Sequence, residues 1–188
     1  MKLHRIRLKL YAEAGAIGDP ERFVPIFHTW IRDHVLGEVL IDVARYTHVH
    51  EGPAVMLVGH HSDYTIDLGE GRPGLAVTRK RDAANDESRI ADVFRAAFAA
   101  ASRLESEPSL SGLRFKSDEL WLTLVDRLHT PNDDATFARL EPELRDFIGR
   151  ALGPETALSR EGAPKEALSV RIRRPRNESV ADVAQRLG

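Results

Sequence analysis

Apolar and polar residues alternate strictly near both ends of the chain. Ile6, Leu8 and Leu10 are separated by basic residues, and the stretch 168–173 has the same period of two. This period is typical of a strand with one buried and one solvent-facing side. Further strands are predicted at residues 43–50, 54–60, 64–68 and 75–80, and a hairpin at residues 113–116 and 119–128, with its turn at Ser117-Asp118.

Three longer stretches instead carry apolar residues at intervals of three and four, which places them on one face of a helix. The first begins at Asp19-Pro20-Glu21, an N-cap followed by proline and an acid. The second is rich in alanine, and the third ends at Gly153-Pro154. The predicted helices cover about residues 19–36, 88–104 and 133–152, with a short fourth helix after Ser179 and a flexible connection at 155–165.

Links between the predicted strands are short, which favours antiparallel pairing. The elements together predict an α+β fold in which a largely antiparallel sheet of about seven or eight strands packs with three main helices. Residues 1–153 are expected to form the α+β domain. Residues 154–188 are expected to add a strand and a short helix to the same domain.

The composition is that of an ordinary globular protein, with 42% hydrophobic and 30% charged residues among 188. The absence of cysteine excludes disulfides, thiolate metal sites and cysteine nucleophiles. A net charge of −2 gives no overall attraction to nucleic acid or to an anionic membrane. No stretch is long and apolar enough for a signal peptide or a membrane span. We therefore expect a cytoplasmic protein, with no membrane partner and no nucleic acid.

Several short motifs resemble those of a group of uncharacterised bacterial proteins with no known activity. They include Phe27-His28-Thr29-Trp30-Ile31, Tyr46-Thr47-His48-Val49 and Asp126-Arg127-Leu128-His129-Thr130-Pro131-Asn132. The resemblance covers most of the chain and implies one intact domain. The order helix, three strands, helix, two strands, helix is also similar to that of the type III secretion chaperones, with a strand added at each end. Those proteins dimerise and hold extended partner segments.

Histidines are concentrated in the first third of the chain, where six of the eight lie between His28 and His61. Neutral imidazole binds zinc, nickel, copper or iron when three or four ligands converge. The candidate ligands are His28, His48, His50, His60 and Asp63. A divalent transition metal such as zinc is therefore the candidate cofactor, in a metal-binding protein or a metal-dependent hydrolase.

The predicted strands do not bring all these ligands together. A tight hairpin at Glu51-Gly52-Pro53 would place His60 opposite Ala44, about 13 Å from His48 and too far for one metal ion. The pattern therefore favours histidines that hydrogen-bond locally, and no cofactor is expected in that case. A nucleophilic Ser62 beside these histidines is disfavoured because no G-x-S-x-G turn accompanies it.

Basic residues share one face of the first and the last predicted strands. They are Arg5, Arg7, Lys9, Arg171 and Arg173. If the two strands pair, these side chains form a stripe that suits phosphate or carboxylate groups. The stripe has almost no interleaved aromatic residues, which base stacking on a sheet requires. A solvated face is therefore the favoured interpretation, and anion or nucleic-acid binding is the alternative.

No catalytic constellation stands out in this pattern. The sequence therefore predicts a non-catalytic binding or accessory protein, of a chaperone-like or adaptor-like kind. We expect it to form a homodimer and to engage a protein or peptide partner, either on its sheet or in a groove between sheet and helices.

Overall fold

The computed structural model describes residues 5–46, 52–80 and 86–188, and for residues 86–88 it describes the backbone alone. A single eight-stranded antiparallel sheet dominates the fold. The strand order is β2-β3-β4-β5-β1-β6-β8-β7. The strands are β1 (Ile6–Ala12), β2 (Leu40–Arg45), β3 (Pro53–Gly59), β4 (Ser62–Asp67), β5 (Gly74–Arg79), β6 (Phe115–Leu124), β7 (Ala157–Glu161) and β8 (Leu168–Arg173). The predicted α+β class with a largely antiparallel sheet is confirmed.

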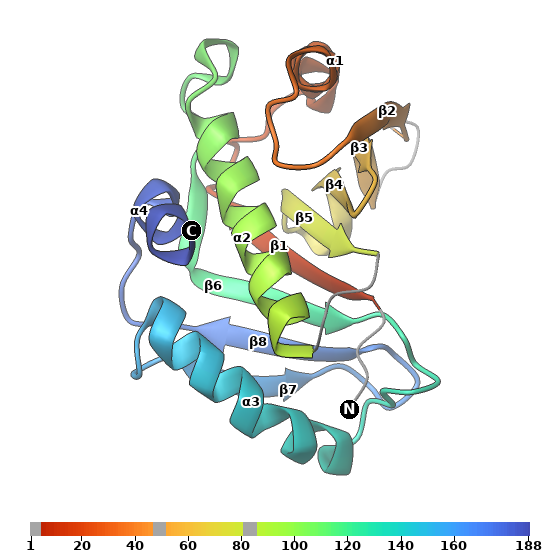
Figure 1. Cartoon of the computed structure of the whole chain (residues 1–188), viewed down its shortest axis with the longest axis vertical. Helices are drawn as coiled ribbons and strands as arrows, with labels where there is room; N and C mark the ends of the chain where they lie inside the picture. The colour runs from red at the N-terminus through yellow and green to blue at the C-terminus, as the bar shows by residue number, and fades with distance from the viewer. Residues whose placement is uncertain (1–4, 47–51, 81–85) are drawn as a thin grey trace.

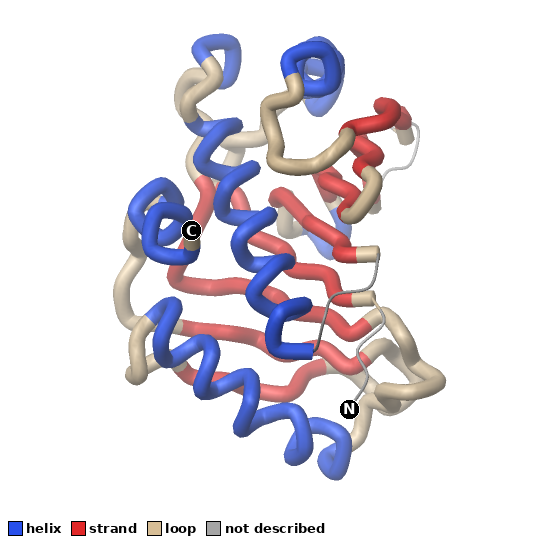
Figure 2. The backbone as a smooth tube through the Cα atoms, viewed as in Figure 1, coloured by secondary structure: helices blue, strands red, loops and turns tan. Residues whose placement is uncertain are grey.

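Four α-helices cover one face of this sheet (Figures 1 and 2). They are α1 (Phe23–Asp33), α2 (Asp86–Glu105), α3 (Asp134–Leu152) and α4 (Val180–Leu187). Helix α2 lies across β1 and β5, α3 lies against β7, α4 contacts β6, and α1 covers β2 and β3. No described helix is both long and apolar enough to cross a membrane.

The alternation of β1 explains why only one face is covered. Ile6, Leu8 and Leu10 are fully buried and face the helices, where they join one continuous apolar core. Arg7 and Lys9 point to the opposite side because successive side chains of a strand alternate between faces. We call that opposite side, on which no described α-helix packs, the open face.

The predicted hairpin at residues 113–128 is wrong, because Phe115–Leu124 forms one continuous strand, β6. Ser117 is fully buried in this strand. Its hydroxyl donates to the carbonyl of Glu178 at 2.7 Å, and its N–H donates to the side chain of Asn177 at 2.9 Å. The segment that precedes α4 therefore provides hydrogen-bond partners for Ser117. From the sequence alone, this polar residue indicates a turn.

The flexible connection predicted at residues 155–165 is also wrong, because it contains β7, which pairs with β8 along its whole length. The buried amide of Asn132 donates to the carbonyls of Glu161 at 2.9 Å and Ala163 at 3.2 Å. Arg160 donates to the same side chain at 3.0 Å. A residue just before α3 therefore holds this hairpin in place.

Two expectations about strand pairing change as well. The first and last predicted strands do not pair, because β6 lies between β1 and β8. The strand predicted at 43–50 begins earlier, at Leu40, and residues 47–50 lie outside the described part of the chain. His60 lies opposite Val39, whose carbonyl accepts its N–H at 2.8 Å, rather than opposite Ala44. The register of β2 against β3 therefore differs from the one predicted, with Ala44 opposite Met56.

Candidate functional site

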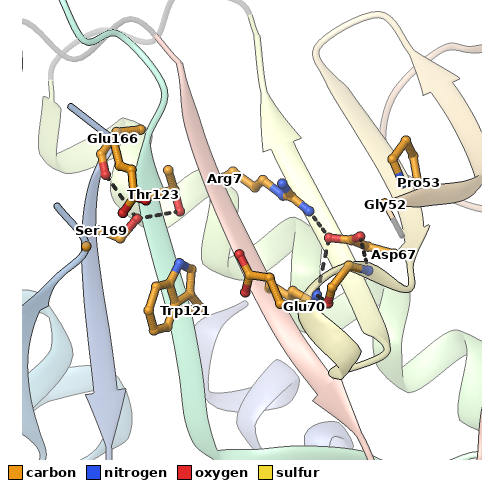
Figure 3. Close-up of a pocket in the computed structure, with 13 residues that line it drawn as sticks. Arg7, Gly52, Pro53, Asp67, Glu70, Trp121, Thr123, Glu166 and Ser169 are labelled. Carbon is orange, nitrogen blue, oxygen red and sulfur yellow. Dashed lines mark hydrogen bonds and ion pairs between the residues drawn. The ribbon is translucent and has the colours of Figure 1, made fainter. Parts of the chain in front are cut away.

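A hollow of about 470 Å³ lies on the open face (Figure 3). Side chains from three adjacent strands, β1, β6 and β8, form its floor. They are Arg7, Lys9, Trp121, Thr123 and Ser169. The loops that follow β4 and β7 contribute Glu70 and Glu166 to its walls. The hollow therefore brings together residues that are more than 100 positions apart in the sequence.

An ion cluster centred on Asp67 occupies one side of the hollow. Arg7 forms an ion pair with Asp67, and the Lys9 Nζ lies 3.3 Å from the same carboxylate. The Lys9 Nζ also donates to the carbonyl of Gly69 at 3.2 Å, and the Gly69 N–H donates to Asp67 at 2.9 Å. The Lys9 and Asp67 side chains are each only 5% exposed. Neither charge is therefore open to solvent.

Burial and neighbouring charges act against each other in this cluster. Burial by itself raises the pKa of Asp67, but the positive charges of Arg7 and Lys9 outweigh it, so that the pKa lies below its usual range. Burial lowers the pKa of Lys9, and the single carboxylate beside it does not fully compensate. The cluster therefore stabilises the charged form of Asp67, whereas it does not fully offset the cost of burying the charge of Lys9.

A second ion cluster lies further along the open face and is centred on Glu119. Arg72 donates two hydrogen bonds to this carboxylate, at 3.0 and 2.8 Å, and its guanidinium stacks 3.6 Å from the centre of the Tyr11 ring. The bidentate hydrogen bond from Arg72 lowers the pKa of Glu119, because it outweighs burial, which by itself would raise that pKa. Arg171 and Arg173 each approach the same carboxylate to 3.8 Å.

The predicted basic residues therefore share a face, although their strands do not pair. Lys9, Trp121 and Arg171 form one row across β1, β6 and β8. Four of the five predicted anion-binding residues, Arg7, Lys9, Arg171 and Arg173, have carboxylate partners on the same face. Arg5, which precedes β1, is exposed. The carboxylates come from other strands, so the pattern of basic residues gave no sign of them.

Trp121 is one of the residues of the hollow that the sequence interpretation missed. Its ring is half-buried, and the guanidinium of Arg171 lies 5.3 Å from the ring centre. Its indole N–H has no hydrogen-bond acceptor among the described residues. The sequence did contain a signal: Trp121 alternates with the buried Leu120 and Leu122, so it must face away from the core.

The predicted metal ligands do not converge in the part of the chain that the structure describes, where no group of three such side chains could hold a metal ion. His60 is exposed in the turn after β3, with its ring against that of His61. Asp63 forms an ion pair with Lys80 at 2.6 Å, and His28 is exposed on α1. His48 and His50 lie outside the described residues, so a site that includes them stays a prediction.

A second pocket, of about 380 Å³, lies beside α2 and contains a hydrogen-bonded carboxylate. Glu38 accepts the N–H groups of His61 at 2.5 Å and Ser62 at 3.0 Å, and the Tyr64 hydroxyl at 2.7 Å. Burial, together with the charge of Glu38, raises the pKa of Tyr64. Ser62 is fully buried, and the Arg79 guanidinium donates to its hydroxyl at 3.5 Å.

Comparison with other proteins adds no family to this description. No protein-family model matches the chain, and no curated protein matches it. The fold and the site define a two-layer α+β protein with an uncovered sheet face. The resemblances drawn from the sequence stay predictions, although one strand, β6, stands where the chaperone-like element order had two.

Proposed function

We propose that this protein is a non-catalytic binding protein that holds a segment of a partner protein on the open face of its sheet. The observation that carries the proposal is the hollow, which is formed on a sheet face that no described helix covers and contains a half-buried tryptophan with an unused N–H. Tryptophan is enriched among the residues that dominate binding energy at interfaces. A volume of about 470 Å³ accommodates one or two side chains of a partner.

The pairing of charges in the hollow supports binding rather than catalysis. A general base or a nucleophilic lysine must reach the substrate, yet Lys9 and Asp67 are almost fully buried against each other. The groups that do face the hollow include the indole of Trp121, the hydroxyls of Thr123 and Ser169, the exposed carboxylates of the walls, and the Arg7 guanidinium, which is already paired with Asp67. These groups are suited to contact and hydrogen bonding.

Selection from a library of random twelve-residue peptides tests this function. Binding of the selected peptides is then measured with the variants Trp121→Ala and Thr123→Arg, the second of which fills the hollow. We expect both to weaken binding by about tenfold or more, the loss of an interface anchor. Thr29→Arg makes the same change at an exposed position on α1 and should leave affinity unchanged. Peptides that bind equally well to Thr123→Arg would overturn the proposal.

We also propose that the protein forms a homodimer through side chains near the edge strand β2. Val39 and Ile41 are 65% and 57% exposed there, and exposed apolar side chains that lie close together mark a surface for association. The Asp42 carboxylate accepts the Val43 N–H at 2.7 Å, which discourages a continuous sheet between two copies. Size-exclusion chromatography with light scattering should give twice the mass of one chain, and a monomer at all micromolar concentrations would contradict the dimer.

A further inference from the structure

The charges around the hollow favour a positively charged ligand. Among the described residues that line it, the two cations Arg7 and Lys9 face three carboxylates, so that the net charge is minus one. Both cations are already bonded to Asp67. The two remaining carboxylates, Glu70 and Glu166, are exposed on the walls. The hollow is therefore negative at its opening, although the strand beneath it is basic.

Trp121 adds an aromatic surface to the floor of the hollow. Figure 3 shows its ring beside Glu70, on the side of the Asp67 cluster, with Thr123 and Ser169 between the ring and Glu166. Arg171 approaches the ring but does not line the hollow, so the part of the indole that does line it is open to a ligand. Aromatic faces attract ammonium and guanidinium groups, and more strongly when water is partly excluded.

The backbone holds one wall carboxylate by a hydrogen bond and carries the other in a left-handed conformation. Glu166 accepts the Ala163 N–H at 2.8 Å through one oxygen, which leaves its other oxygen for a ligand. The backbone of Glu70 has a φ of 65°, a left-handed conformation that residues other than glycine rarely adopt. A glycine at this position would relieve the strain. A charged side chain therefore stands at the opening of the hollow in a conformation that costs stability.

We propose that the hollow receives a lysine or arginine side chain of the partner segment, with its charge between Glu70 and Glu166 and its stem against Trp121. This inference rests on the open-face binding function proposed above. It reverses the sign of the ligand in the alternative drawn from the sequence, in which the basic strands take an anion, because buried carboxylates neutralise the strands and exposed ones stand at the opening.

Tryptophan fluorescence provides a direct measurement, because the chain has two tryptophans and Trp30 is fully buried. In a Trp30→Phe variant, all emission comes from Trp121. If that variant does not fold, acrylamide quenching of the wild-type protein reports the same ring, since the quencher reaches only Trp121. The probes are capped five-residue peptides of glycine with lysine, arginine, glutamine or glutamate at the centre. We expect the lysine and arginine peptides to bind about fivefold more tightly than the glutamine peptide.

Three variants separate a binding role of the carboxylates from a structural one. Glu70→Gln with Glu166→Gln should abolish the preference for the basic peptides, whereas Glu13→Gln removes an exposed charge outside the hollow and should not. Glu70→Gly should raise the urea midpoint of unfolding and still lose much of the preference, a combination that a purely structural residue would not give.

The outcomes distinguish this inference from the function on which it rests. A preference for the glutamate peptide, or equal binding of all four, would overturn the cationic ligand and leave open-face binding intact. If none of the four peptides changes the emission of Trp121 at millimolar concentration, the cationic ligand is likewise overturned. If the peptides selected from the library also fail to change it, the open face is not the binding surface and both proposals fail.

Discussion

The two faces of the sheet differ in how they are stabilised. The face under the helices is a continuous apolar core, in which α2 and α3 meet through the rings of Phe94 and Phe147, 5.2 Å apart. The open face instead carries two ion clusters, centred on Asp67 and Glu119. Apolar contacts depend on the area removed from water, whereas ion pairs depend on the exact partner. The comparison indicates that apolar burial holds the helices on the covered face, whereas specific ion pairs organise the open face on which we propose that a partner binds.

Two neighbouring residues of β6 give the largest expected effect. Leu122 is fully buried under the helices, and Trp121 lies on the open face. We expect Leu122→Ala to lower the free energy of unfolding by about 2–5 kcal/mol, because it removes buried methyl groups and leaves a cavity. Trp121→Ala should cost less than about 1.5 kcal/mol, since the ring is only half-buried. Urea denaturation measures both, and equal losses would show that the open face is packed like the core.

Removal of the central carboxylate should have the next largest effect. Asp67→Asn keeps an acceptor for the Gly69 N–H but leaves the Lys9 ammonium buried without its partner. We expect a loss of about 2–3 kcal/mol at pH 7 in urea denaturation, at or below the range for breaking a buried ion pair. A double variant with Lys9→Met should recover part of this loss.

The pH dependence of the same variant provides a second check. The pKa of Asp67 is lowered in the folded protein, so the stability that its charge contributes is complete above the unfolded value, about 3.9, and is lost as the pH falls through the folded value. The difference between wild type and Asp67→Asn should therefore shrink below about pH 4. A difference that is constant from pH 7 to pH 3 would contradict the ion pair.

The smallest expected effect concerns the partly exposed bidentate bond of Arg72. Lysine at this position cannot donate two parallel hydrogen bonds to Glu119 or stack flat on Tyr11. Because the Arg72 side chain is 38% exposed, we expect Arg72→Lys to cost only about 0.5–1 kcal/mol. Thermal unfolding should show the difference narrowing in high salt, and a salt-independent difference would assign it to stacking instead.

The sequence predicted those parts of the fold that depend on local periodicity. The strands at β1 and β8 and the helices follow from spacings of two, three and four residues. The error at Ser117-Asp118 has a different origin, since the polar groups of Ser117 are satisfied by Asn177 and Glu178, about 60 positions away. Strand β7 depends in the same way on the distant side chain of Asn132.

The candidate site was predictable only in part, for the same reason. The spacing of Arg7 and Lys9 does place them on one face, as expected. Their partner Asp67 belongs to β4 and is 60 positions from Arg7 in the sequence. It comes close to them because β5 pairs with β1 on one side and with β4 on the other. Charges that neutralise each other through long-range pairing cannot be read from neighbouring residues.

The central position of β1 has a consequence for how the chain folds. Strand β1 is synthesised before both of its neighbours, which are β5, around residue 75, and β6, which ends at Leu124. Pairings between such distant segments form slowly, because the entropy cost of closing a long loop comes before the favourable contacts between the strands. The chain must therefore be synthesised as far as Leu124 before β1 is paired on both sides, and until then its apolar side is open to aggregation or to a general chaperone.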